Sequence, residues 1–174
     1  MKSKALLVVV LMLCSGCLSG CGDPAVSSPD ALKVVFYPLA GAANVASDVE
    51  PAIYFSSDVD ESSVGSESVL LLYTDLTCTL EEEQLVCECG SEWNEEDDAE
   101  VEVDTENPQV VKVLPSDGLL QNRCYVMVCT TAVRGNEQGP LSDLGLPSDE
   151  KSALGLSKVR IGAKQSFSTV WVED

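Results

Sequence analysis

Eight short runs rich in β-branched and aromatic residues fill the sequence from residue 33 onward, and they constrain the fold more than any other feature. Such residues favour strands, and turn-forming residues bound many of the runs. Some runs alternate, so that Tyr125, Met127 and Cys129 share one face. The runs are residues 33–37, 52–55, 69–73, 85–89, 100–103, 110–114, 124–130 and 166–172. Seven or eight strands in about 140 residues predict one all-β domain over residues 33–174, built as an antiparallel β-sandwich.

Helix signals are confined to residues 148–156, which predict one or two turns. Ser148 is the expected N-cap, and Glu150 stands near the positive end of the helix dipole. No internal repeat is visible in the sequence, which favours a single domain.

The overall charge of the chain is strongly negative, with 29 acidic and 10 basic residues and a formal net charge of -19. Such a surface repels phosphate backbones, so the composition argues against nucleic-acid binding. Histidine is absent, which excludes a Ser-His-Asp triad, a Cys-His dyad and an imidazole metal site. A glycine-rich phosphate loop and a G-x-S-x-G motif are also absent from the sequence. We therefore expect no enzymatic activity, no cofactor and no small-molecule substrate.

Residues 1–20 have the layout of a secretion signal. A basic start precedes an apolar run of nine residues, 5–13, which is shorter than the ~20 residues that span a bilayer. Residues 18–21, Leu-Ser-Gly-Cys, resemble the bacterial lipobox, in which a signal peptidase cleaves just before a cysteine that is diacylated. The resemblance implies that this segment is a lipoprotein signal peptide and that Cys21 carries a lipid anchor at a membrane surface.

The residues around Cys21 indicate which cysteine is lipidated and to which membrane the protein is sorted. Cys17 fits the lipobox less well, because Cys14 stands where an aliphatic residue is preferred. Residues 21–32 are rich in Pro, Ser and Asp and predict a short tether. In some bacteria an acidic residue next to the lipidated cysteine influences sorting. Gly22 takes that position here and Asp23 follows it, which favours the outer membrane over the inner one.

Three motifs early in the domain and two late ones stand in a recognisable order. Residues 38–45 read PLAGAANV, residues 51–56 read PAIYFS and residues 59–64 read VDESSV. The run at 125–129 leads into a Gly- and Asn-rich turn, and residues 167–169 read FST. This order resembles bacterial Ig-like domains of the S-layer (SbsA-like) type. The resemblance spans residue 34 to about residue 172 and implies an Ig-like β-sandwich that binds through loops and sheet edges.

Single residues in these motifs have a physical role in such a fold. Gly41 and Asn44 suit a turn, because both tolerate positive φ. Phe55 and Val59 are expected in the core, on either side of a strand end. Tyr125 stands where a tyrosine corner would tie its strand to the preceding loop. Two departures from the family, a long acidic stretch and five added cysteines, are particular to this chain.

An odd number of cysteines, five, follows the proposed lipid site. They are Cys78, Cys87, Cys89, Cys124 and Cys129. An exported domain lies in a compartment that permits disulfides, so we expect two bridges and one spare thiol. A hairpin closing around residues 81–84 would pair Leu80 with Leu85 and set Cys78 opposite Cys87, within bonding reach.

Cys89 has two candidate partners on one later strand. These are Cys124 and Cys129, which are five residues apart, face opposite surfaces of a regular strand and so cannot easily join each other. The alternative is a zinc site formed by Cys87, Cys89, Cys124 and Cys129. Its C-x-C spacing is shorter than the C-x2–4-C pairs of structural zinc sites, so we favour disulfides.

Residues 81–106 form an acidic insertion that holds 13 of the 29 carboxylates and no basic residue. The simplest interpretation is a solvated loop and strand edge that discourages pairing with other strands. The alternative is a surface for a divalent cation or a basic partner, since hard cations take carboxylate oxygens. An exposed Trp93 would anchor such a contact, whereas a covered one would close an end of the sandwich. The candidate contact residues are Trp93, Glu95, Glu96, Asp97 and Asp98.

These features together predict a cell-envelope lipoprotein that is anchored through Cys21 and carries a non-enzymatic Ig-like module. We expect the module to be structural or to bind another envelope protein. The alternative, from a different class, is a metal-binding envelope protein that uses the cysteine or acidic clusters. A shift in melting temperature with Zn²⁺ or Ca²⁺ would separate the two, because only a ligand that prefers the native state stabilises it.

Overall fold

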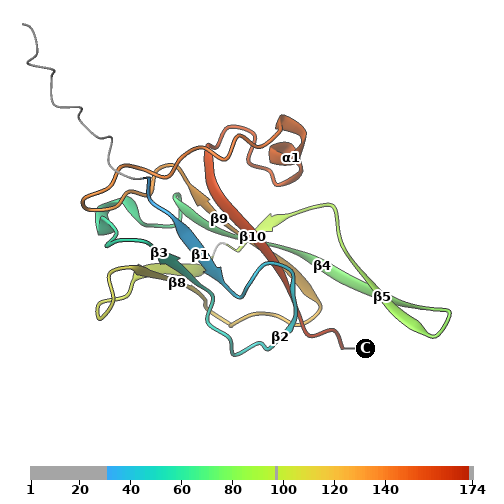
Figure 1. The fold of residues 1–174 in the computed structure, drawn as a ribbon. Helices are drawn as coiled ribbons and strands as arrows, with labels where there is room; N and C mark the ends of the chain where they lie inside the picture. The colour runs from blue at the N-terminus through green and yellow to red at the C-terminus, as the bar shows by residue number, and fades with distance from the viewer. Residues whose placement is uncertain (1–30, 97, 173–174) are drawn as a thin grey trace, which may run out of the picture.

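The computed structural model describes residues 31–96 and 98–172, and these form a mostly β protein with two sheets (Figure 1). The predicted predominance of β-structure is confirmed. The strands are β1 (Val34–Tyr37), β2 (Ala42–Val45), β3 (Ala52–Phe55), β4 (Val69–Glu81), β5 (Gln84–Cys89), β6 (Asn94–Glu95), β7 (Ala99–Val103), β8 (Val110–Pro115), β9 (Arg123–Thr130) and β10 (Ile161–Thr169). Two short helices, η1 (Glu61–Ser63) and α1 (Ser148–Ala153), occur in the described ranges. The predicted signal peptide, 1–20, and the lipid site Cys21 lie outside these ranges.

The two sheets differ in size and in the direction of one strand pair. One sheet has the order β1-β3-β8-β7, and the other has the order β2-β10-β9-β4-β5 with β6 also paired to β4. The pairing of β10 with β2 is parallel and the other strand pairs are antiparallel, so the antiparallel prediction is wrong at this pair. Gly41 lies in the turn before β2 with a φ of 69°, as predicted, whereas Asn44, with a φ of 58°, lies inside β2, so its predicted place in a turn is wrong. The turn at Gly41 lies between β1, at the edge of one sheet, and β2, at the edge of the other.

Strand boundaries differ from the prediction mainly where the sequence turns polar. The run predicted at 69–73 continues to Glu81, and the run predicted at 166–172 begins at Ile161. Both extensions are held by antiparallel neighbours, which a run of apolar residues does not reveal. The predicted helix is shorter, Ser148–Ala153, and its N-cap is Pro147 rather than Ser148. Pro147 has the extended backbone of a cap (ψ 151°), which places Ser148 in the first turn.

The main core lies between the two sheets and contains residues from both. Tyr125 of β9 is fully buried, and its ring stacks on Phe167 of β10 with the centroids 5.4 Å apart. The Tyr125 hydroxyl accepts a hydrogen bond from the backbone N–H of Leu120 at 2.8 Å, the predicted tie to the preceding loop. Phe55 and Val59 are buried in the same core, which confirms their predicted positions.

A second apolar cluster covers the outer face of the six-stranded sheet. Val126 and Val128 of β9 point away from the main core and pack with Leu154 and Leu156, which follow α1. Strand β9 is therefore buried on both faces, which explains its continuous apolar run. Within residues 31–96 and 98–172, no helix is long and apolar enough to cross a membrane.

Candidate interaction surface

The outer half of β4 and the whole of β5 form a hairpin that stands out from the body of the protein (Figure 1). Strand β9 pairs with β4 only as far as Asp75. Beyond that residue β4 is paired with β5 alone, in the described part of the chain. We call residues 76–89 the hairpin. All six residues of β5 are exposed, so the hairpin has no core of its own.

The hairpin turn is tight and uses residues that are unusual for it. Glu81 pairs with Gln84, leaving Glu82 and Glu83 as a two-residue loop. Their φ angles are 47° and 71°, the left-handed region that such hairpin turns require. Asn-Gly is the common choice at these positions, so two glutamates carry a conformational cost.

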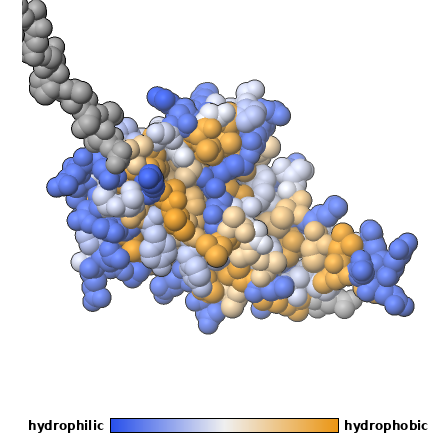
Figure 2. Space-filling view, in the orientation of Figure 1, coloured by the Kyte–Doolittle hydropathy of each residue, from blue (hydrophilic) through white to orange (hydrophobic). Residues whose placement is uncertain are grey.

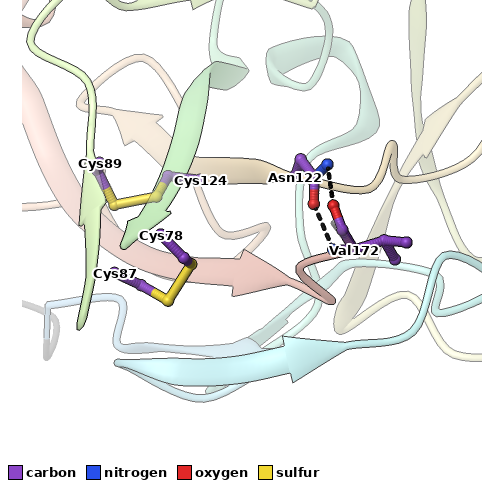
Figure 3. Close-up of a disulfide and its surroundings, with 6 residues drawn as sticks. All are labelled: Cys78, Cys87, Cys89, Asn122, Cys124 and Val172. Carbon is purple, nitrogen blue, oxygen red and sulfur yellow. Dashed lines mark hydrogen bonds between the residues drawn. A yellow bond between two sulfur atoms is a disulfide. The ribbon is translucent and has the colours of Figure 1, made fainter. Parts of the chain in front are cut away.

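Two disulfides hold the hairpin (Figure 3). Cys78 is bonded to Cys87 across the two strands, which confirms the predicted pair. Cys89 is bonded to Cys124, one of its two candidate partners, and ties the base of the hairpin to β9. Cys129 is the spare thiol that the odd count predicted. The hairpin is thus fixed covalently both across itself and to the body.

The free thiol lies on the opposite surface of β9 from Cys124, as the five-residue spacing predicted. Cys129 is fully buried in the main core. Burial raises the pKa of its thiol to about 12, which keeps the sulfur protonated and unreactive at neutral pH. The four thiols of the zinc alternative are therefore not gathered at one point. Among the residues that the structure describes, no group of three or more His, Cys, Asp or Glu could hold a metal ion.

The hairpin exposes apolar side chains near its tip. Leu80 and Leu85 lie opposite each other on the face that also carries the Cys78–Cys87 bridge, and they are 74% and 53% exposed. Val86 is exposed on the other face. Figure 2 shows the tip at the right in blue, with orange directly behind it. The turn of the hairpin carries Glu81, Glu82 and Glu83, and Glu88 lies nearer its base, opposite Thr77.

The exposure of these leucines was not predicted. The expected pairing of Leu80 with Leu85 is confirmed, yet the sequence did not show that β9 ends before they are reached. One signal was present: the apolar pair is flanked by acidic residues and by two cysteines at matching distances from the turn. That pattern indicates a hairpin held by a disulfide rather than by a core.

Carboxylates of the predicted acidic insertion are distributed over three strands rather than gathered in one loop. Residues 81–106 supply β5, β6 and β7, and Glu100 and Glu102 project from the edge strand β7. Asp104 accepts from Lys112 Nζ at 2.8 Å. That hydrogen bond, together with those from two backbone N–H groups, lowers the pKa of Asp104. This end of the segment therefore acts as an ion-paired strand edge.

The predicted contact residues lie beside the second apolar cluster, away from the hairpin tip. Trp93 is partly buried and packs against that cluster, so it covers the sheet and is not a free-standing anchor. Glu95 and Asp98 are exposed, whereas Glu96 is partly buried and donates its backbone N–H to Leu71 (2.8 Å). Asp97 lies outside the described residues. Burial of an indole removes much apolar area from water, which is why Trp93 does not stand free.

Comparison with known proteins identifies no relative: no family model matches the chain, and no curated protein matches it.

Proposed function

We propose that this chain is a lipid-anchored protein of the bacterial cell envelope and a non-enzymatic interaction module. In this proposal Cys21 holds the acyl chains, residues 22–32 form the tether, and an Ig-like sandwich displays the hairpin to another protein. The outer membrane is the proposed site. The hairpin replaces Trp93 and its acidic neighbours as the main contact element.

The observation that carries the proposal is the exposed hairpin that two disulfides hold in place. Four of the five cysteines after residue 21 are used in bridges on this one element. Disulfides of this kind persist in oxidising compartments, which agrees with an exported protein. A pair of leucines held in water at a rigid projecting tip is costly unless a partner covers it, since apolar patches on protein surfaces commonly mark contacts.

Support for the Ig-like part comes from the core. Two packed sheets enclose Tyr125, and its hydroxyl bond to Leu120 has the form of a tyrosine corner. Phe55, Val59 and Phe167, which carry the family resemblance, all contribute to that core.

The anchor and the oxidation state are tested together by native intact mass. Protein extracted from membranes with mild detergent, without reductant, should begin at Cys21, carry acyl mass and lack four hydrogens, two for each disulfide. A Cys21→Ser variant should lose the acyl mass and leave the membrane fraction. An unlipidated wild-type chain, or one with all thiols reduced, would contradict the proposal.

The contact element is tested by cross-linking in intact cells. The double variant Leu80→Ser with Leu85→Ser should lose its cross-linked product, because both side chains are exposed and the fold does not depend on them. Leu120→Ser is the matched control, since it removes another exposed leucine far along the chain. Equal loss of the cross-linked product in both variants would show that the hairpin is not the contact element.

A further inference from the structure

A groove lies between the free edge of β1 in one sheet and β10 in the other. Its volume is about 390 Å³, and it is lined by residues 34–36, residues 162–165 and Leu144. Most of these side chains are apolar, and among the described residues no carboxylate lines the groove. Figure 2 shows an orange band along β1 at this place.

Strand β1 has a free edge at the groove, and β10 is unpaired on this side only over residues 162–165, as far as the structure describes the chain. Strand β1 ends its sheet, and β2 pairs with β10 only at Phe167 and Thr169. Residues 162–165 of β10 therefore have β9 on one side and the groove on the other. A strand edge of this kind offers main-chain donors and acceptors to an incoming strand.

The other terminal strands are protected against such pairing. Glu100 and Glu102 occupy β7, Glu88 occupies β5, and the left-handed backbone of Asn44 interrupts β2. Strand β1 has the sequence VVFY, without a charge, and Val35 is 59% exposed. The β1 edge is thus the one that is open to another strand in the described sheets.

Most basic residues of the mature chain belong to the segments that border this groove, and Lys164 lines it. Of the ten Lys and Arg residues, two precede Cys21, and five of the remaining eight belong to the start of β1 or to the segment that runs from α1 into β10. These five are Lys33, Lys151, Lys158, Arg160 and Lys164. Residues 141–165 contain three carboxylates, and two of them pair with Arg160 and Lys164. On these segments basic residues outnumber acidic ones by five to three, whereas the hairpin carries four glutamates and no basic residue.

We propose that the hairpin of one copy of this chain docks into the β1–β10 groove of a second copy. The groove is a shallow, open depression between the two sheets, and the hairpin stands clear of its own body and is free to reach such a surface (Figure 1). Its leucines match the apolar lining of the groove, and its glutamates match the basic side chains on the segments that border it.

This inference rests on the proposed function, which makes the hairpin the contact element, and it names the partner. The two contacting surfaces differ, so the interface is heterologous, and a pair of copies keeps one free hairpin and one free groove. Copies would therefore add head to tail, in rings or in chains.

The test is native mass spectrometry of the detergent-extracted mature protein, with two variants that each disable one surface. The hairpin variant is Leu80→Glu with Leu85→Glu, and the groove variant is Val35→Glu with Leu144→Glu; all four side chains are exposed, so folding should persist. Wild type should form a concentration-dependent series of oligomers. Each variant alone should be monomeric, with association at least about tenfold weaker, a change of ~1.4 kcal/mol.

A mixture of the two variants tests whether the hairpin of one copy binds the groove of another. Each keeps one intact surface, so an equal mixture should give a one-to-one heterodimer and nothing longer, which also shows that both variants are folded. A monomeric wild type, a monomeric mixture, or a dimer that survives the hairpin variant would overturn the inference. If wild type is monomeric but still forms the hairpin-dependent cross-link, the partner is a different protein and the proposed function stands.

Discussion

The two halves of β4 form one continuous strand, yet they are held in place by different forces. The first half, beginning at Val69, lies between β9 and β6 and is buried on both faces. The second half, ending at Glu81, pairs with β5 alone and lies mostly in water. A two-stranded hairpin is at best marginally stable in water, and here two disulfides take the place of a core. The body depends on burial, whereas the hairpin depends on covalent bonds.

This difference separates the parts of the molecule that a mutation would unfold from those that it would only loosen. Truncation in the body creates a cavity among the residues that hold both sheets together. Removal of a bridge from the hairpin frees an element that contributes few buried contacts.

The largest effect is expected from Phe167→Ala. Phe167 is buried and stacks on Tyr125, so truncation should lower the free energy of unfolding by about 3–5 kcal/mol. Urea unfolding with the disulfides intact measures this change in the free energy of unfolding. The control is Tyr54→Ala, which truncates an exposed ring of the other sheet. A loss below about 1 kcal/mol would show that the two sheets do not share this core.

The next largest effect is expected from removing the Cys89–Cys124 bridge with alanine at both positions. This bridge spans 35 residues, against 9 for Cys78–Cys87, so it restricts the unfolded chain more. Its loss should cost about 2–4 kcal/mol. The Cys78→Ala with Cys87→Ala variant is the matched comparison and should cost less, because only the hairpin is loosened. Urea unfolding of both variants measures the two losses of stability. A larger loss for the Cys78→Ala with Cys87→Ala variant would contradict this account.

A smaller effect is expected from Tyr125→Phe. The change removes the hydroxyl that accepts from the Leu120 N–H and leaves that donor unpaired, at a cost of about 1–2 kcal/mol. Tyr73→Phe is the control, since Tyr73 lies beside Tyr125 with its ring centroid 6.4 Å away. Thermal unfolding of the two variants should show a lower Tm only for the first.

A gain in stability is expected from changing the hairpin turn to Glu82→Asn with Glu83→Gly. Both positions have positive φ, and Asn-Gly adopts it at lower cost, so the gain should be roughly 0.5–1 kcal/mol. Hydrogen exchange should slow in residues 76–89 and stay unchanged in β9. Faster exchange in the hairpin would show that the turn is not the type described.

The smallest effect is expected from pH, through carboxylates at the body surface. Hydrogen bonds from Ser62 to Asp60, from Lys112 to Asp104 and from the Gly145 N–H to Asp143 lower the pKa of each acid below its usual value. A pKa that is lower in the folded state gives stability that is present above the unfolded pKa, near 3.8, and is lost as the pH falls through the folded pKa. Asp104→Asn should therefore reduce Tm at pH 7 and leave it unchanged in strong acid.

The sequence predicted the body better than the hairpin, and the reason is physical. Strand β3 matches its predicted run, and Phe55 and Tyr125 lie where their patterns placed them, because burial imposes alternation on the residues. The Cys78–Cys87 bridge followed from symmetry about the turn.

Features set by distant parts of the chain were not predictable in the same way. The two-residue strand β6 has no periodicity, and the parallel pairing of β2 depends on where β10 lies. The partner of Cys89 and the exposure of Leu80 depend on where β9 ends, which is a property of the whole sheet. Trp93 was ambiguous because the cluster that covers it comes from residues far along the chain.

Hydrogen exchange measured by mass spectrometry, with and without reductant, tests most directly the claim that covalent bonds hold the hairpin while burial holds the body. In the oxidised protein both regions should be protected. After reduction, exchange in residues 76–89 should become fast, while residues 125–130 of β9 stay protected by the core. A hairpin that remains protected after reduction, or a body that loses protection with it, would contradict the account.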